Sequence, residues 1–242
     1  MADKELVGWN PDLVAVVIPA KDEAATVGGV VLRAREYASE VIVVDGHSAD
    51  RTPFEAREAG AVVIEDHNKG KGDAIRTSLP VISKSITVFM DADGSHDPAD
   101  IPKLVDPLLR GEADHVSGSR LLGGSSELHG GFDEFLRLMG SSLITAIIGW
   151  RFKVRLSESQ NGFRAIRTDV LRKLGLRENS TTIEQEMIIK TLSEGFRLAE
   201  VPAHEYRRVS GSSHIRISRA WFRYIYSLMR YLFFRWPSKS SS

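Results

Sequence analysis

The sequence lacks cysteine, a net charge and any long hydrophobic run. Without cysteine, the 242-residue chain has no disulfide scaffold, no thiolate metal site and no cysteine nucleophile. No stretch reaches the ~18 uninterrupted apolar residues of a membrane-spanning helix. The polar opening segment MADKELVGWNPD does not have the pattern of a secretory signal. We therefore expect a cytoplasmic protein, and we expect no nucleic acid among its partners.

The zero net charge conceals an uneven distribution of charge along the chain. Residues 201–242 contain eight basic residues and one acid, a charge of +7, so the first 200 residues carry −7. Eight of the 19 aromatic residues lie between Arg219 and Trp236. A basic and aromatic end on an acidic body indicates that this end meets something anionic.

The composition is that of an ordinary globular protein, 42% hydrophobic and 26% charged, and the first 120 residues alternate regularly between two patterns. Short, β-branched apolar runs at 13–18, 41–44, 61–64 and 86–90 are typical of strands buried on both faces, as parallel strands are. Helical patterns follow them at 24–38, 51–59, 72–83 and 98–109. This alternation predicts an α/β fold with a doubly wound sheet, whose ligands bind beyond the carboxyl ends of the strands.

The second half of the chain is less regular. We expect a short strand at 115–117, helices at 132–150 and 182–194, a strand at 195–202 and a closing helix at 218–236. Loops rich in glycine and serine separate some of these elements. Because no internal repeat and no linker is evident, we expect one domain, residues 1–217, with a C-terminal helix and polar tail, residues 218–242.

Asp91 and Asp93 form the strongest chemical signal. Two carboxylates at positions i and i+2, at the end of a hydrophobic strand, can converge on one divalent cation. Their hard oxygen ligands suit Mg²⁺ or Mn²⁺, which would also bind substrate phosphates. The structural alternative is a turn or a helix cap, but the position at a strand end favours the metal.

Two further segments have the composition of phosphate-binding loops. In residues 69–72 (KGKG), glycines let the backbone approach a ligand, and the lysines and the following helix N-terminus attract phosphate. The P-loop pattern G-x-x-x-x-G-K-[ST] is absent. Residues 207–214 combine arginines, serines and a glycine, as a clamp on a pyrophosphate would. A solvated loop is the alternative for both segments.

In this order, the segments resemble family 2 glycosyltransferases of the GT-A fold, and most of all the dolichyl- and polyprenyl-phosphate sugar transferases. The resemblance covers roughly residues 13–217 and includes the strings VVIPAKDEAATV, VIVVDGHSADRT, GKGDA and MDADGSHDP. It implies nucleotide contacts from four residues: Pro19, Glu23, Asp45 and Lys71.

The same resemblance implies that Asp91 and Asp93 hold the metal and the diphosphate, with Ser95 at the position of a further metal ligand. The string GSR implies that Arg120 faces an acceptor phosphate. The string ESQNGFR implies that Glu158 lies where sugar and acceptor meet. The candidate catalytic residues are therefore Asp93, Arg120 and Glu158.

The string RVSGSSH implies that Arg208, Ser213 and His214 complete the diphosphate site. The expected reaction is metal-dependent, inverting transfer of a hexose from a UDP- or GDP-sugar. A lipid phosphate acceptor is already anionic and needs only a cation such as Arg120 beside it. A hydroxyl acceptor needs a base, for which Glu158 or Asp93 is the first candidate.

Two function classes stay open, and the closing helix bears on the choice between them. One is an enzyme that loads a polyprenyl or dolichyl phosphate at a membrane surface, and the other is a soluble glycosyltransferase with a small polar or phosphorylated acceptor. At about 100° per residue, Arg219, Arg223 and Arg230 fall within ~40° of one another. An apolar, aromatic face lies opposite and comprises Trp221, Tyr224, Ile225, Leu228, Met229, Tyr231 and Leu232.

Such a helix is typical of a membrane interface, which predicts a peripheral protein on the cytoplasmic face of a membrane. The alternative is that the apolar face packs on the protein's own core or on a second subunit. The sequence leaves the oligomeric state open.

Overall fold

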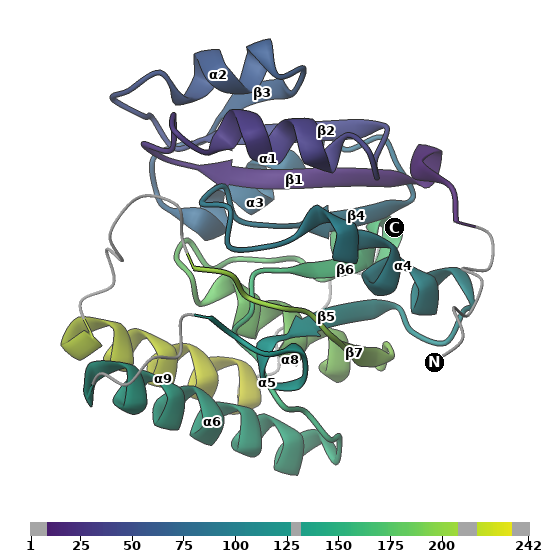
Figure 1. The fold of residues 1–242 in the computed structure, drawn as a ribbon. Coiled ribbons are helices and arrows are strands. Elements are labelled where there is room, and N and C mark those ends of the chain that lie inside the picture. The colour runs from purple at the N-terminus through teal and green to yellow at the C-terminus, as the bar shows by residue number, and fades with distance from the viewer. Residues whose placement is uncertain (1–8, 127–131, 208–216, 234–242) are drawn as a thin grey trace.

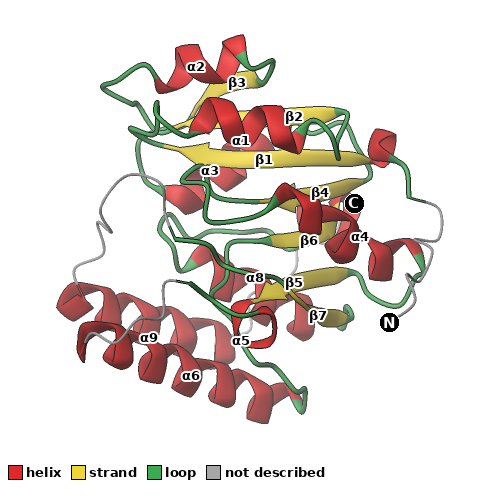
Figure 2. Ribbon diagram, in the orientation of Figure 1, coloured by secondary structure: helices red, strands yellow, loops and turns green. Residues whose placement is uncertain are grey.

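A sheet of seven strands forms the centre of the molecule, and helices cover both of its faces (Figure 1, Figure 2). The computed structural model describes residues 9–126, 132–207 and 217–233. The strand order is β3-β2-β1-β4-β6-β5-β7, and β6 alone runs antiparallel to its neighbours. This is the α/β architecture that the alternating sequence patterns predict, with one antiparallel strand inserted.

The first half of the chain contains the parallel strands that the sequence predicts. These strands are β1 (Val14–Ala20), β2 (Glu40–Asp45), β3 (Val62–Glu65) and β4 (Ile86–Phe89). The helices are α1 (Val27–Ala34), α2 (Thr52–Glu58), α3 (Lys71–Ser78) and α4 (Ile101–Leu109), with short 3-10 turns η1 (Pro11–Leu13) and η2 (Pro98–Asp100). All eight expected elements are present, with ends that differ by a few residues.

The second half adds the elements that complete the sheet and a further layer of helices. They are β5 (His115–Ser119), α5 (Arg120–Gly123), α6 (Phe132–Phe152), β6 (Arg164–Arg167), α7 (Thr168–Lys173), α8 (Ile183–Ser193), β7 (Leu198–Pro202) and α9 (Ile217–Phe233). The sequence patterns do not predict β6, whose four residues RAIR carry little apolar signal. Because β6 runs antiparallel to β4 and β5, it begins at the edge where they end, and it brings residues 157–163 to that edge.

Strand β1 shows why the central strands must be apolar throughout. Val16 and Ile18 pack with α1, α2 and α4 on one face of the sheet, and Val17 packs with α3, α7 and α8 on the other. Successive side chains of a strand point to opposite faces, so both faces of β1 are core. The expectation of burial on both faces is wrong for β3, where Val62 is 51% exposed. This strand lies at the edge of the sheet and is only half covered.

Helices α6 and α9 lie side by side, outside α8 (Figure 1). Leu228, Tyr231 and Leu232 of α9 are buried with isoleucines of α6 and α8. The expectation that these three residues belong to a membrane-facing surface is therefore wrong, because their i, i+3, i+4 spacing turns them toward the protein core. The exposed apolar stripe of α9 consists of other residues: Phe222, Ile225, Tyr226, Met229 and Phe233. Within the described ranges, no helix is long and apolar enough to cross a bilayer.

The packing of α9 predicts opposite outcomes for two adjacent substitutions. Leu228→Ala should lower the free energy of unfolding by about 2–5 kcal/mol, because it leaves a cavity between α9 and α6. Met229→Ala is the matched control and should change it by no more than about 0.5 kcal/mol, because Met229 is half exposed. Urea denaturation measures both, and equal losses would contradict the orientation of α9.

Candidate active site

A pocket of about 190 Å³ lies beyond the carboxyl ends of β1 and β2, beside the start of α3. Pro19 and Lys71, both expected to contact a nucleotide, line this pocket. Asp66 and Asn68 line it as well, and the ammonium of Lys21 donates to the amide oxygen of Asn68 at 3.1 Å. The sequence reasoning assigned no role to Asp66 or Asn68, although the polar segment after β3 marks this edge of the sheet.

Asp45 and Glu23 hold the turns next to this pocket. The carboxylate of Asp45 accepts hydrogen bonds from the main-chain N–H of Ser48 at 3.1 Å and from its hydroxyl at 2.6 Å. The carboxylate of Glu23 accepts a hydrogen bond from the Thr26 hydroxyl at 3.1 Å. Neither residue is among the described residues that line the pocket. Both carboxylates thus stabilise the loops that follow β2 and β1.

Lys71 joins the pocket to the Asp91–Asp93 turn. Its ammonium lies 2.5 Å from Asp91 Oδ1 and 2.7 Å from Glu184 Oε1. Burial acts to lower the pKa of Lys71, but the charges of Asp91 and Glu184 outweigh it and raise the pKa, so the ammonium stays protonated. Glu184, in the first turn of α8, was not a predicted site residue. The contact across the edge of the sheet reveals its role.

The backbone around Lys71 is held by close approach to a second loop. Gly70 has φ +109°, a conformation that glycine adopts without strain, and a Cβ at Gly72 would collide with the carbonyl of Glu178. The carboxylate of Glu186 accepts main-chain hydrogen bonds from Arg177 and Glu178 at 2.8 Å each. Helix α8 therefore fixes Lys71 directly through Glu184 and supports its loop through Glu186.

The Asp91–Asp93 turn is pinned by its own neighbours. Asp93 is buried, and its Oδ1 accepts a hydrogen bond from the main-chain N–H of Ser95 at 3.0 Å. The main-chain N–H of Asp91 donates to Nδ1 of His96 at 3.2 Å, and the ring of His96 stacks on Phe163. Burial lowers the pKa of His96, which keeps the ring neutral and able to accept this hydrogen bond.

The donor set at this turn fits a hard divalent cation. Asp91 and Asp93 supply carboxylate oxygens, and Gly162 lets the chain pass close to Asp91 and Lys71. A Cβ at Gly162 would lie 2.7 Å from Lys71 Nζ and 3.1 Å from Asp91 Oδ2. Across the described segments, no cluster of three or more histidine, cysteine or acidic side chains forms a closed metal site. A cation at Asp91 and Asp93 would therefore share its coordination with water and phosphate oxygens, as Mg²⁺ does.

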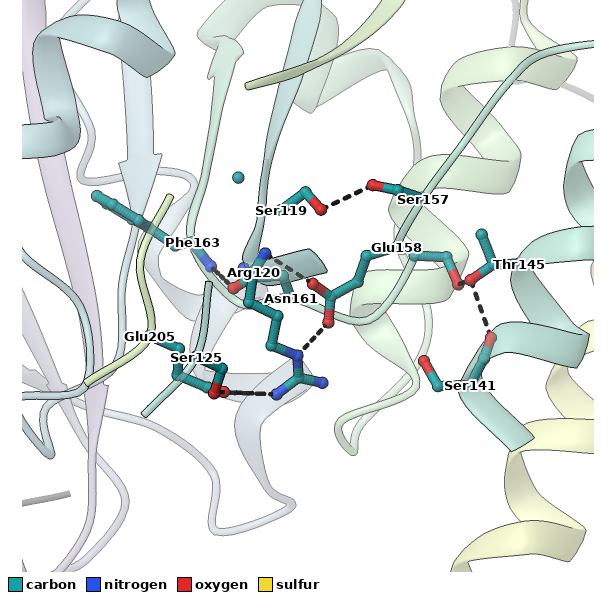
Figure 3. Close-up of polar contacts among 12 residues, drawn as sticks. Ser119, Arg120, Ser125, Ser141, Thr145, Ser157, Glu158, Asn161, Phe163 and Glu205 are labelled. Atoms are coloured by element: carbon teal, nitrogen blue, oxygen red, sulfur yellow. Dashed lines mark hydrogen bonds and ion pairs between the residues drawn. The ribbon is translucent and has the colours of Figure 1, made fainter. Parts of the chain in front are cut away.

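Arg120 lies between two carboxylates at the end of β5 (Figure 3). Its Nε is 2.6 Å from Glu158 Oε1, and its Nη1 donates to both carboxylate oxygens of Glu205 at 2.9 and 3.0 Å. Burial raises the pKa of Glu158 despite the opposing charge of Arg120. At Glu205 burial also acts to raise the pKa, but the charge of Arg120 outweighs it and lowers the pKa. Sequence reasoning predicted Arg120 and Glu158 but gave no signal for Glu205.

A carboxylate on strand β7 holds the main chain at Glu158. Glu200 of β7 accepts hydrogen bonds from the main-chain N–H groups of Ser157 at 2.7 Å and Glu158 at 3.0 Å. The hydroxyl of Ser157 also lies 2.7 Å from that of Ser119, next to Arg120 (Figure 3). The main chain on either side of the Arg120–Glu158 pair is thus fixed by hydrogen bonds.

The two groups of charges face one another across the same edge of the sheet. The DAD turn that carries Asp91 continues to His96, which pairs in an isolated β-bridge with Glu205. The predicted clamp residues Arg208, Ser213 and His214 lie outside the described residues. The segment that leads to them, residues 203–207, crosses this edge, and the main-chain N–H of Tyr206 donates to Ser95 O at 2.9 Å. The arrangement therefore places two charged clusters, one at Lys71 and one at Arg120, at the same edge of the sheet.

Comparison with known proteins identifies the family. The model of "Glycosyl transferase family 2" matches residues 15–175. The chain belongs to this family. It is a nucleotide-sugar-dependent glycosyltransferase with a GT-A-like fold, and its sequence resemblance to that family is confirmed.

Several relatives of this glycosyltransferase are known. The glycosyltransferase AglJ of Haloferax volcanii is 29% identical over 205 residues, which cover 84% of this chain but 66% of AglJ. The dolichyl-phosphate hexose transferase of the same organism is 30% identical over 207 residues, covering 84% of this chain and 87% of that protein. Relatives therefore include enzymes named for a lipid phosphate.

A solved structure with the same fold contains a small phosphorylated ligand. Glucosyl-3-phosphoglycerate synthase from Mycobacterium tuberculosis, in complex with phosphoglyceric acid, is 25% identical with a TM-score of 0.73. The match covers 91% of this glycosyltransferase and 80% of the synthase. Other crystal structures of that synthase contain Mn²⁺ or Mg²⁺ with uridine diphosphate.

The space at Gly162 predicts how the glycosyltransferase responds to one added methyl group. Gly162→Ala should displace the Lys71 ammonium and crowd Asp91, which should weaken binding of Mn²⁺ with uridine diphosphate by about tenfold, or 1.4 kcal/mol. Calorimetric titration measures this affinity. Gly29→Ala in α1 is the control, because its Cβ would have no neighbour within 4 Å. Equal affinities for the two variants would show that Gly162 does not shape the site.

Proposed function

We propose that this glycosyltransferase moves a hexose from a UDP- or GDP-sugar to a polyprenyl or dolichyl phosphate, with Mg²⁺ or Mn²⁺ as cofactor and with inversion at the anomeric carbon. The observation that carries the proposal is the meeting of two charged stations at one sheet edge. Lys71 and Asp91 form one station, and Arg120 with Glu158 forms the other.

The donor binds, in this proposal, with its nucleoside in the pocket lined by Pro19, Asp66 and Asn68 and its diphosphate toward Lys71. A cation on Asp91 and Asp93 supplies positive charge for the departing diphosphate. Lys71 adds a protonated ammonium, held in place by Glu184. Asp45 and Glu23 keep the pocket loops in position, and the clamp residues Arg208, Ser213 and His214 close the diphosphate site.

The acceptor binds at Arg120. A phosphate oxygen is already largely anionic at neutral pH, so its attack on the anomeric carbon needs positioning rather than proton removal. Attack from the side opposite the diphosphate inverts the anomeric centre. For a hydroxyl acceptor, Glu158 is the candidate base, because burial raises its pKa toward neutrality.

The lipid part of the acceptor is supported by the outer surface of α6 and α9. Each helix carries exposed apolar residues along one side: Met139, Leu143 and Trp150 on α6, and Phe222, Ile225, Tyr226, Met229 and Phe233 on α9. Arg223 of α9 is also exposed and comes next to Phe222 in the sequence. An aromatic, apolar face flanked by arginine suits the interface of an anionic membrane. We therefore propose a peripheral enzyme on the cytoplasmic face, with residues 1–217 as its catalytic domain and residues 218–242 as its contact helix and tail.

A small phosphorylated acceptor is the second candidate. The structural similarity to a synthase solved with phosphoglyceric acid favours it. Arg120 would bind that phosphate by the same chemistry. In this case, the enzyme is soluble, and a partner or a second subunit packs on the exposed stripes of α6 and α9.

Loss of one carboxylate should abolish transfer. Asp91→Asn should reduce turnover by about 100-fold or more, because the cation that stabilises the departing diphosphate loses one carboxylate ligand. Purified protein is incubated with Mn²⁺, a panel of UDP- and GDP-hexoses, prenyl phosphates and 3-phosphoglycerate, and products are identified by mass spectrometry. Asp169→Asn, at an exposed position of α7, is the control of equal charge. Undiminished turnover by Asp91→Asn would refute the metal assignment.

Vesicle binding separates the two acceptor classes. Substituting both Phe222 and Tyr226 with serine should reduce co-sedimentation with phosphatidylglycerol vesicles by about tenfold, since two aromatic side chains leave the bilayer. Leu32→Ser removes an apolar residue of α1 that is 57% exposed and should have no effect. If the wild-type protein does not bind vesicles, the soluble enzyme is the correct class.

A further inference from the structure

Glu205 occupies Arg120 in the way that a phosphate would. Both carboxylate oxygens accept from the same guanidinium nitrogen, Nη1, at 2.9 and 3.0 Å (Figure 3). Carboxylate and phosphate groups both present anionic oxygens that accept charge-assisted hydrogen bonds from an arginine. An acceptor phosphate directed to Arg120 therefore competes with a group that belongs to the protein itself.

The charges around Arg120 make this competition substantial. Arg120 contributes one positive charge, and Glu158 and Glu205 contribute two negative charges, so the trio as a whole carries −1. An incoming phosphate meets a site whose cation is more than neutralised. Since the Arg120 side chain is 22% exposed, an anion in solution can still reach it.

Glu205 is better suited to exchange than Glu158. The Glu158 side chain is 2% exposed, and its carboxylate also accepts from the main-chain N–H of Arg120 at 3.1 Å. Its main chain is fixed by Glu200. The Glu205 side chain is 13% exposed and its second partner is the hydroxyl of Ser125 at 2.8 Å.

The position of Glu205 also connects the acceptor station to the donor clamp. Its main-chain N–H donates to Gly124 O at 3.1 Å, and its carbonyl accepts from Ser126 at 2.8 Å. The chain continues through Tyr206, which is bonded to the loop after Asp93, toward the clamp residues that begin at Arg208.

We propose that Glu205 is a specificity-determining residue that competes with the phosphate of the acceptor for Arg120. The acceptor's phosphate displaces the Glu205 carboxylate. An anion is admitted only if it binds Arg120 and its surroundings more favourably than this carboxylate does. This inference rests on the proposed function, since it assumes a phosphate acceptor at Arg120. It concerns a phosphate monoester, whether on a lipid or on a small metabolite.

The test measures the binding of inorganic phosphate by calorimetry. No sugar donor is present, so no turnover occurs. Glu205→Gln keeps the side-chain size and one oxygen acceptor but removes the charge. It should tighten the phosphate dissociation constant by about tenfold, equivalent to about 1.4 kcal/mol. Asp169→Asn removes the same charge at an exposed position of α7 and should leave the affinity at the wild-type value. In the double variant Arg120→Ala with Glu205→Gln, the gain should disappear.

Two further arms distinguish the sources of the phosphate. The same proteins are titrated with farnesyl phosphate in phosphatidylcholine vesicles and with 3-phosphoglycerate. The ligand whose affinity increases most in Glu205→Gln identifies the source of the phosphate. Where Glu205→Gln loses thermal stability, Glu205→Asp, which shortens the reach to Arg120, should show a smaller gain of the same sign. Unchanged or weaker phosphate binding by a folded Glu205→Gln overturns the proposal.

The outcome separates this inference from the proposed function. A gain in phosphate affinity without transfer to any phosphate acceptor would keep the competition at Arg120 and reject the proposed reaction. Transfer to a prenyl phosphate with no effect of Glu205→Gln on phosphate affinity would keep the reaction and reject the competition.

Discussion

One partly buried ammonium group holds the catalytic edge of this enzyme together. Lys71 at the start of α3 bridges Asp91 after β4 and Glu184 in the first turn of α8, at 2.5 and 2.7 Å. Each of these three elements comes from a different part of the chain. Removing one partner of a buried ion pair typically costs about 3–5 kcal/mol, because the remaining charge is left uncompensated. The geometry of the Lys71–Asp91–Glu184 cluster therefore depends on the charge balance at Lys71.

A buried arginine, Arg164, supports the same edge of the sheet. Arg164 at the start of β6 is 1% exposed, and burial lowers its pKa to about 10. Its guanidinium donates to the carbonyls of Asn161 and Glu184, with the latter at 3.0 Å. These hydrogen bonds tie the loop before β6 to helix α8. This loop includes Gly162, which lies against Lys71 and Asp91.

The site shows a consistent pattern of compensated charge. Two cations at the edge, Lys71 and Arg120, are each held by two carboxylates, so neither acts as an isolated positive charge. Compensation fixes the side chains in place before substrates arrive, which avoids a cost in side-chain entropy on binding. It also weakens attraction for anions in general. The two cations are thus held in a defined geometry and attract anions less strongly than isolated cations would.

The sequence by itself determined the parallel half of the sheet and much of the site. Continuous β-branched runs, alternating with helical patterns, predict β1 to β4 because parallel strands covered on both faces must be apolar throughout. The same logic predicts that the segments after these strands meet at one edge, and Lys71 and Asp91 do meet there. Arg120 and Glu158, which were both predicted as site residues, form an ion pair.

Only the tertiary structure decided the remaining features. The four residues of β6 have no strand signal of their own, and the pairing with β4 and β5 makes them a strand. The partners Glu184 and Glu205 lie 113 and 85 residues away in sequence from Lys71 and Arg120, and no local pattern links them. In α9, the sequence gives an amphipathic helix, but contact with α6 and α8 decides which apolar residues are core and which are exposed. Periodicity fixes the faces of a helix, whereas the surface that each face meets is a property of the assembled chain.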